Sequence, residues 1–198
     1  MKLWILSFAI ITNFSTTLIS HNQTSKSIKN KLRSISRSNK KQLTQDIGKL
    51  CEFIAKTIVE QKYSPKRYDI RTNIAYEDLS HRQLGELDIV VFDSVSKKAL
   101  LVIEVKCRKN HEKALVQAKR QLRRFKSMVQ KSSYEPENLI IARGDETFAT
   151  DLFKGAKTRV MMPKRCDTCE LSEHEFDVTL ADIAKLQQSI AHSLSNGL

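Results

Sequence analysis

Apolar residues recur at helical spacing in three long segments of the chain. In the first, Ile47, Leu50 and Ile54 fall on one face of a helix, and Thr44 stands before them as a candidate N-cap. In the second, Asn110 is the candidate cap of a helix whose apolar stripe includes Leu122. The pattern therefore predicts helices over residues 44–61, 111–131 and 180–194.

Short apolar runs rich in Val and Ile predict strands between these helices. The predicted strands are residues 68–76, 87–92, 99–105, 139–142 and 158–162. Residues 87–92 and 99–105 are apolar on both faces, as expected for central strands covered on both sides. The order of helix, three strands, helix and strand predicts an α/β fold, with a central mixed β-sheet flanked by helices.

The first 42 residues differ from the rest in pattern. Residues 1–20 contain Lys2 and then an apolar run that is too short to span a bilayer, which predicts a signal or targeting peptide. A secreted or periplasmic product without a stable membrane span follows from that interpretation. An organelle-targeted or cytoplasmic protein is the alternative, because no acidic residue precedes Asp46. Residues 21–42 are polar and basic and predict a flexible arm, which leaves 43–198 as the folded domain.

Charge narrows the choice of partner. The formal net charge is +12, and residues 97–131 hold twelve Lys or Arg against only Glu104 and Glu112. A basic surface of this kind favours nucleic acid as the partner, and an anionic membrane comes second. The alternative is a basic surface that only keeps the protein soluble and binds no partner. No glycine-rich nucleotide-binding loop occurs, so no nucleotide cofactor is expected.

The four cysteines leave the compartment open. Cys166 and Cys169, followed by His174, faintly resemble a zinc site, and a local disulfide or an exposed loop is the alternative. Cys51 and Cys107 lie in apolar surroundings and are predicted to be core thiols.

Three charged residues stand among the apolar positions of the two central strands: Asp88, Glu104 and Lys106. A turn symmetric about Ser96 would place Asp88 opposite Glu104, with Cβ atoms about 4.5–5.5 Å apart. Lys106 would share their face, and Glu86 would point to the other. Two buried carboxylates repel each other unless a divalent cation joins them. The alternatives are a buried Lys106–Glu104 ion pair, which leaves Asp88 without a partner, or charges exposed at strand ends.

These residues resemble the PD-(D/E)XK nuclease superfamily in its D…ExK form. Residues 85–88 read GELD and residues 104–108 read EVKCR, which is similar to a small bacterial family with a GExD…EVKxR signature. Archaeal Holliday-junction resolvases look similar too. The resemblance covers about residues 43–141, and Leu87 stands where the superfamily name has Pro.

The resemblance implies a restriction-endonuclease-like core and a Mg²⁺-dependent deoxyribonuclease, most simply an endonuclease, in which Mn²⁺ could substitute. Asp88, Glu104 and the backbone carbonyl of Val105 would hold the metal. Lys106 would orient the attacking water or stabilise charge on the phosphate. The superfamily often adds a Glu from the first helix, and we expect Glu52 rather than Glu60, because Glu52 borders the apolar face.

The helix after the ExK triplet supplies further candidates. Gln121 and Phe125 resemble a glutamine and aromatic pair of some of these nucleases, although Phe125 also fits plain core packing. The candidate phosphate-binding residues are Arg108, Lys109, Lys119, Arg120, Arg123 and Arg124. The rival interpretations are a non-cleaving DNA- or junction-binding module of the same fold and a membrane-associated structural protein. The oligomeric state stays open, with a homodimer among the options.

Overall fold

The computed structural model describes residues 21–132, 139–166, 169 and 172–196, with only the backbone described for 21–25. The predicted signal or targeting peptide, residues 1–20, lies outside the described residues. In the described part of the chain, no helix has both the length and the apolar character needed to cross a membrane.

A seven-stranded mixed sheet forms the middle of the molecule, with strand order β5-β4-β1-β2-β3-β6-β7. Neighbouring strands from β5 to β3 run antiparallel, whereas β3–β6 and β6–β7 run parallel. The strands are β1 (Tyr68–Glu77), β2 (Gln83–Asp93), β3 (Ala99–Val105), β4 (Ile140–Arg143), β5 (Glu146–Phe148), β6 (Lys157–Lys164) and β7 (Glu175–Thr179). The predicted α/β class with a mixed central sheet is therefore confirmed.

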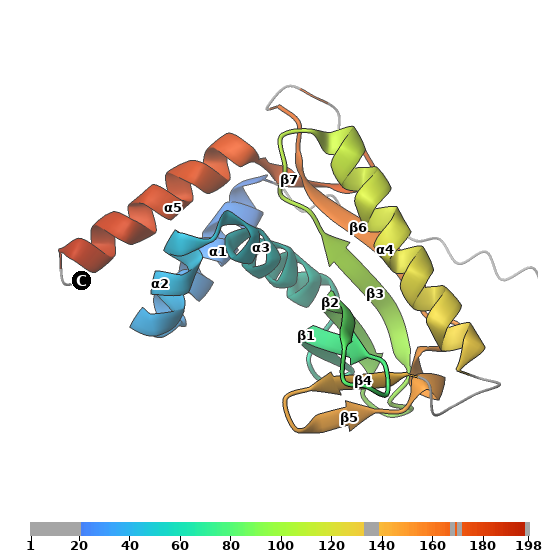
Figure 1. Ribbon diagram of the computed structural model, residues 1–198. Coiled ribbons are helices and arrows are strands. Elements are labelled where there is room, and N and C mark those ends of the chain that lie inside the picture. The colour runs from blue at the N-terminus through green and yellow to red at the C-terminus, as the bar shows by residue number, and fades with distance from the viewer. Residues whose placement is uncertain (1–20, 133–138, 167–168, 170–171, 197–198) are drawn as a thin grey trace, which may run out of the picture.

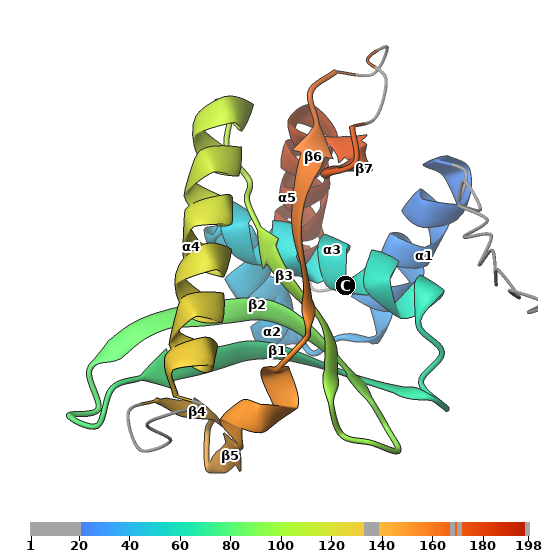
Figure 2. The same ribbon diagram turned by 90° about the vertical axis from the view of Figure 1, so that its right-hand side faces the viewer.

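Helices cover both faces of this sheet (Figure 1). One side carries α1 (His21–Ser34), α2 (Arg37–Gln45), α3 (Ile47–Lys62) and α5 (Leu180–Ser195). The other carries α4 (His111–Lys131) and the 3-10 helix η2 (Thr150–Phe153), as the turned view in Figure 2 also shows for α4. Two apolar cores result. The α3-side core includes Leu50, Ile54 and Ile103, and the α4-side core includes Leu122, Phe125 and Val102.

The segment predicted to be a flexible arm is instead helical. Apart from Ile35 and Ser36, residues 21–42 fall within α1 and α2, so that expectation is wrong for the described residues. The reason is an apolar stripe, because Ile28, Leu32 and Leu43 are buried in the α3-side core. Ser36 separates the two helices and caps α2, with its hydroxyl accepting from the Asn39 N–H at 3.3 Å.

Helix caps explain where the remaining helices begin. Asn110 caps α4 as predicted, its side-chain oxygen accepting from the Lys113 N–H at 3.0 Å. For α3 the predicted cap Thr44 is wrong, because Asp46 Oδ1 accepts from the Gly48 N–H at 2.7 Å and starts the helix at Ile47. The strands β5 and β7 were not predicted, and both are short edge strands.

Candidate active site

The β2–β3 hairpin pairs in the predicted register. Val91 faces Leu101 and Ile89 faces Ile103, so each pair is symmetric about Ser96. The same register would bring Asp88 opposite Glu104, one position beyond the last paired residues. The site therefore lies where the β2–β3 ladder ends.

Strict alternation of side chains fails in β2 at Asp88. Ile89 packs in the α3-side core, whereas Leu87, two residues away, packs in the α4-side core. Regular alternation would place both on one face of the sheet. Opposite Asp88 on β1 lies Asn73, whose φ of 58° puts its backbone in the left-handed region. The two strands thus change face together at this point, and Asp88 lies at the irregularity.

The two carboxylates of the pair have different partners. Asp88 Oδ2 accepts a hydrogen bond of 2.6 Å from the Val105 backbone N–H, in place of a ladder bond between the strands. Glu104 is only 2% exposed, and its Oε1 accepts from Lys106 Nζ. The Lys106–Glu104 ion pair that the sequence left as an alternative is therefore formed, and Asp88 lies beside it.

Burial makes both carboxylates reluctant to ionise. Burial first, and then the negative charge of Glu104, raises the pKa of Asp88 to about 8, although the Val105 N–H and Lys106 oppose the rise. Burial likewise raises the pKa of Glu104, against the opposing effect of Lys106. One backbone donor and one lysine are thus insufficient to stabilise two buried negative charges.

Helix α3 adds an acid and a base to this pair. Glu52 is close enough for its charge to contribute to the raised pKa of both Asp88 and Glu104. Lys49 Nζ, one turn earlier, lies 2.9 Å from Glu52 Oε2. Burial lowers the pKa of Lys49, but the neighbouring carboxylates, Glu52 first, outweigh it and raise the pKa overall. By contrast, Glu60 pairs with Lys31 and Lys56.

Glu86 was expected to point away from the site, and that expectation is wrong. Its Oε1 lies 3.9 Å from Lys49 Nζ, and its charge contributes to the raised pKa of Glu104. The expectation misapplied the alternation, because residues two positions apart in a strand share a face, so Glu86 lies on the side of Asp88. Lys49 was not among the predicted site residues, although its position one turn before Glu52 was an available signal.

Because Gly85 has no side chain, the side chain of the buried Tyr76 can lie directly against its backbone. A Cβ atom at Gly85 would lie 2.3 Å from the hydroxyl oxygen of Tyr76, its cross-strand neighbour. The Tyr76 ring packs against Phe125 of α4, with ring centroids 5.2 Å apart. Phe125 is thus a core residue, and the packing interpretation is the one confirmed. Burial raises the pKa of Tyr76, with Arg124 opposing and Glu104 adding to the rise, so α4 approaches the site here.

The remaining predicted site residues lie on α4 or in the segment just before it. Gln121 has a buried side-chain oxygen, Oε1, without a hydrogen-bond partner among the described residues. The predicted phosphate-binding residues are all exposed, namely Arg108, Lys109, Lys119, Arg120, Arg123 and Arg124. Their exposure leaves these cations available to an anionic partner.

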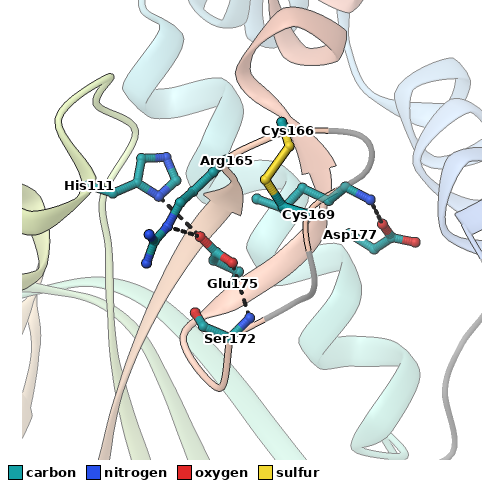
Figure 3. The surroundings of a disulfide bond; sticks show 8 residues. His111, Arg165, Cys166, Cys169, Ser172, Glu175 and Asp177 are labelled. Atoms are coloured by element: carbon teal, nitrogen blue, oxygen red, sulfur yellow. Dashed lines mark hydrogen bonds and ion pairs between the residues drawn. A yellow bond between two sulfur atoms is a disulfide. The ribbon is translucent and has the colours of Figure 1, made fainter.

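A second buried carboxylate was missed by the sequence analysis (Figure 3). Glu175 Oε1 lies 3.2 Å from His111 Nδ1 and 3.2 Å from Arg165 Nε, and Oε2 accepts from the Ser172 N–H at 3.1 Å. Burial alone would raise the pKa of Glu175, but the donors of Ser172, Arg165 and His111 lower it overall. His111, left without a role by the sequence, thus joins α4 to β7.

All four cysteines are paired in two disulfides. Cys166 and Cys169 form the local disulfide that was the alternative to zinc, beside the Glu175 cluster. Cys51 joins Cys107, so the prediction of free core thiols is wrong, although Cys51 is fully buried as expected. The sequence could not pair residues 51 and 107, because only folding brings α3 against the end of β3.

Four carboxylates and two lysines thus gather where β2, β3 and α3 converge: Glu52, Glu86, Asp88, Glu104, Lys49 and Lys106. Fully ionised, they carry four negative charges against two positive ones. Within the described ranges, no three His, Cys, Asp or Glu side chains are already arranged as a metal-ligand group. Models of known families, curated proteins and solved structures contain no match to this chain.

Proposed function

We propose that this chain is a divalent-metal-dependent nuclease that hydrolyses phosphodiester bonds of DNA. The observation that carries the proposal is the buried pair Asp88 and Glu104 beside Lys106, at the end of the β2–β3 ladder. Support for a restriction-endonuclease-like core comes from the order of α3, three antiparallel strands and α4, and from β6, which follows β4 and β5 and pairs parallel with β3.

The donor set of the site fits a hard divalent cation. Asp88 and Glu104 offer carboxylate oxygens, which Mg²⁺ and Mn²⁺ prefer, and the carbonyl of Val105 is the third proposed ligand. The raised pKa of both carboxyls indicates that they lack compensating positive charge. When bound there, the cation would act as a Lewis acid on a phosphoryl oxygen and offset the charge that develops during hydrolysis.

The remaining side chains position the reactants. Lys106, which donates to Glu104, holds a positive charge where it can orient the attacking water or stabilise the phosphate. Glu52 adds a carboxylate from α3, beside Lys49. We assign to Gln121, whose buried side-chain oxygen has no hydrogen-bond partner among the described residues, the role of accepting a hydrogen bond from a water.

The basic surface would bind the DNA backbone. Helix α4 carries seven Lys or Arg and a single acid, Glu112. Arg108 and Lys109 lie two and three positions after Lys106 and are exposed, so these cations are the ones nearest in sequence to the proposed metal ligands. Such contacts give affinity without sequence information, which suits a nuclease of broad specificity.

Two observations favour the second candidate, a DNA- or junction-binding module of the same fold that does not cleave. Lys106 already pairs with Glu104, and the described carboxylates are not arranged as a complete metal-ligand group. A binder, however, has no need to bury Asp88 with so little compensation. That cost of burial is why we place the nuclease first.

The two disulfides support a secreted or periplasmic location. Disulfides persist in oxidising compartments and are rare where thiol reductants are abundant. Both pairs, Cys51–Cys107 and Cys166–Cys169, would survive there. This agrees with the signal peptide predicted from the sequence.

The test is a cleavage assay on supercoiled plasmid, linear duplex, single-stranded DNA, a four-way junction and RNA. We expect wild type to cut DNA with Mg²⁺ or Mn²⁺ and not in EDTA, and Asp88→Asn to cut nothing. Asp145→Asn, an exposed carboxylate in the β4–β5 turn, is the matched control and should cut like wild type. Binding without cleavage by wild type would favour the second candidate. If wild type neither binds nor cuts any form, both are wrong.

A further inference from the structure

Both half-cystines of one disulfide are sequence neighbours of candidate active-site residues. Cys51 precedes Glu52 on α3, and Cys107 follows Lys106 at the end of β3. Their Cα atoms are 6.1 Å apart, and 56 positions separate them in the sequence. The bond is therefore a direct covalent link between the helix that supplies Glu52 and the strand end that supplies Lys106.

The non-covalent contacts of α3 at this point give less control over position. The neighbours Leu50 and Ile54 are fully buried in the α3-side core, but apolar packing is not directional. Glu52 itself is paired with Lys49 of the same helix, and the contact of this pair with β2, from Lys49 Nζ to Glu86 Oε1, is long at 3.9 Å. The disulfide is thus the contact that fixes the height and rotation of Glu52 relative to β3. Misplacement of a reacting group by about 1 Å can cost about a hundredfold in rate.

We propose that the Cys51–Cys107 disulfide is a positioning cross-link of the candidate active site and that its reduction lowers the rate of cleavage by releasing Glu52. This inference rests on the proposed nuclease function. The reductant is a dithiol, such as dithiothreitol or a protein with a CxxC pair. Two electrons and two protons pass from the dithiol to the cystine, which yields two cysteine thiols and a disulfide in the reductant.

The surroundings of the two sulfurs allow thiol–disulfide exchange to begin at Cys107. Cys51 is fully buried, whereas Cys107 is partly exposed. Lys106 and Arg108 flank Cys107, and these cations favour an approaching thiolate. The dithiol therefore attacks the sulfur of Cys107, the thiolate of Cys51 leaves and takes up a proton, and the second thiol of the reductant releases Cys107.

The second disulfide is a natural control. Cys166 and Cys169 are three positions apart, so their bond closes a short loop and joins no second element to it. Their neighbourhood is the Glu175 cluster rather than the site. Its loss should leave the position of Glu52 unchanged.

The experiment compares the full chain before and after reduction with dithiothreitol. Thiol alkylation and mass spectrometry first establish that Cys51 and Cys107 are linked in the oxidised protein and free in the reduced one. We expect kcat for plasmid nicking to fall about tenfold to a hundredfold on reduction, with the Kd for DNA unchanged and kcat restored by reoxidation. All rates are measured below the unfolding temperature of the reduced protein.

Three variants separate positioning from general stabilisation. The double variant Cys166→Ser/Cys169→Ser should keep the full response to reduction, and Cys51→Ser/Cys107→Ser should have the low kcat and no response. In a Glu52→Gln background, reduction should have little further effect, because the residue it displaces is already lost. A loss that is equally large in the Glu52→Gln background would overturn the positioning role.

Hydrogen exchange gives a readout that does not depend on cleavage. Reduction should speed amide exchange in residues 47–55 and 104–107 and leave α4 unchanged. A chain that cuts DNA equally well after verified reduction overturns the inference and leaves the nuclease proposal intact. A chain that never cuts, yet shows this local change in exchange, overturns the nuclease proposal and leaves the cross-link between α3 and β3 established. If alkylation finds Cys51 and Cys107 free before reduction, the inference is wrong.

Discussion

Two buried carboxylate sites in the same sheet are held in opposite ways. Glu175 on β7 has donors from three directions, the Ser172 N–H, Arg165 and His111. Although burial alone would raise its pKa, these donors lower it overall. Its side chain is 2% exposed and its charge is compensated without any ligand.

The Asp88–Glu104 pair is as deeply buried but poorly compensated. Asp88 accepts from the Val105 N–H and Glu104 pairs with Lys106, but burial still raises the pKa of both carboxyls. The charge of Glu104 adds to the rise at Asp88. The donors around a buried carboxylate thus distinguish a structural acid from a functional one. A buried acid with its own donors holds the fold together, whereas buried acids without them destabilise it unless a cation binds.

The largest effect expected from this difference is on cleavage. Glu104→Gln should lower kcat by about a thousandfold or more, because several kcal/mol of transition-state stabilisation by the metal would be lost. Glu175→Gln should stay within about threefold of wild type when folded, since Glu175 holds structure only. Plasmid-nicking rates at equal folded protein measure both. Similar losses in the two variants would remove the functional distinction between the sites.

The next effect is on stability, and here the larger loss is expected at Glu175 rather than at the Asp88–Glu104 pair. Glu175→Gln should lower the free energy of unfolding by about 2–4 kcal/mol, since it replaces the buried carboxylate that pairs with His111 and Arg165 by a neutral amide. Urea denaturation at pH 7 measures it. Glu173→Gln, a neighbour whose side chain is 83% exposed, is the matched control and should change stability little. An unaffected Glu175→Gln variant would show that the cluster does not stabilise the fold.

Asp88→Asn should stabilise the metal-free protein. The folded pKa of Asp88 is about 8, whereas an unfolded Asp titrates near pH 3.9. The folded state therefore keeps a proton that the unfolded state loses, and wild-type stability falls as pH rises from about 4 to 8. In EDTA, the gain from Asp88→Asn should grow over that range to about 1–3 kcal/mol at pH 8. A gain that is constant with pH, or a loss, would contradict the raised pKa.

The smallest effect concerns the surface beside the site. Arg120→Gln and Arg123→Gln should each weaken binding of duplex DNA about threefold to tenfold and lower the salt-dependence slope by about one. Lys185→Gln, an exposed cation of α5 on the other side of the sheet, is the control. Binding measured by fluorescence anisotropy over a series of salt concentrations tests this. An equal effect at Lys185 would mean that the net charge of +12, rather than the α4 face, attracts DNA.

Local patterns were enough to predict the central part of the fold. Strand β3 and the cap of α4 at Asn110 were predicted to the residue, because periodicity and capping are local signals. The register about Ser96 was also confirmed, since a short turn determines how two strands pair. The helical arm was missed although Ile28, Leu32 and Ile35 recur at helical spacing, because the basic composition suggested disorder.

What could not be predicted depends on contacts between distant segments. The irregularity opposite Asn73, which puts Leu87 and Ile89 on different faces of the sheet, depends on the pairing of β2 with β1. Glu175 meets His111 across 64 positions of sequence, and Cys51 meets Cys107 across 56. Such pairs are decided by how α3, α4 and β7 pack on the sheet.

A cation site at Asp88 and Glu104 is tested by the unfolding temperature of metal-free protein during a titration with Mg²⁺ or Mn²⁺ at pH 7. A cation that binds the folded state at Asp88 and Glu104 must stabilise it. We predict a saturable rise of several degrees for wild type, the same rise from a lower start for Glu175→Gln, and none for Asp88→Asn. A wild type that does not respond, or an Asp88→Asn variant that responds like wild type, would contradict a cation site at this pair.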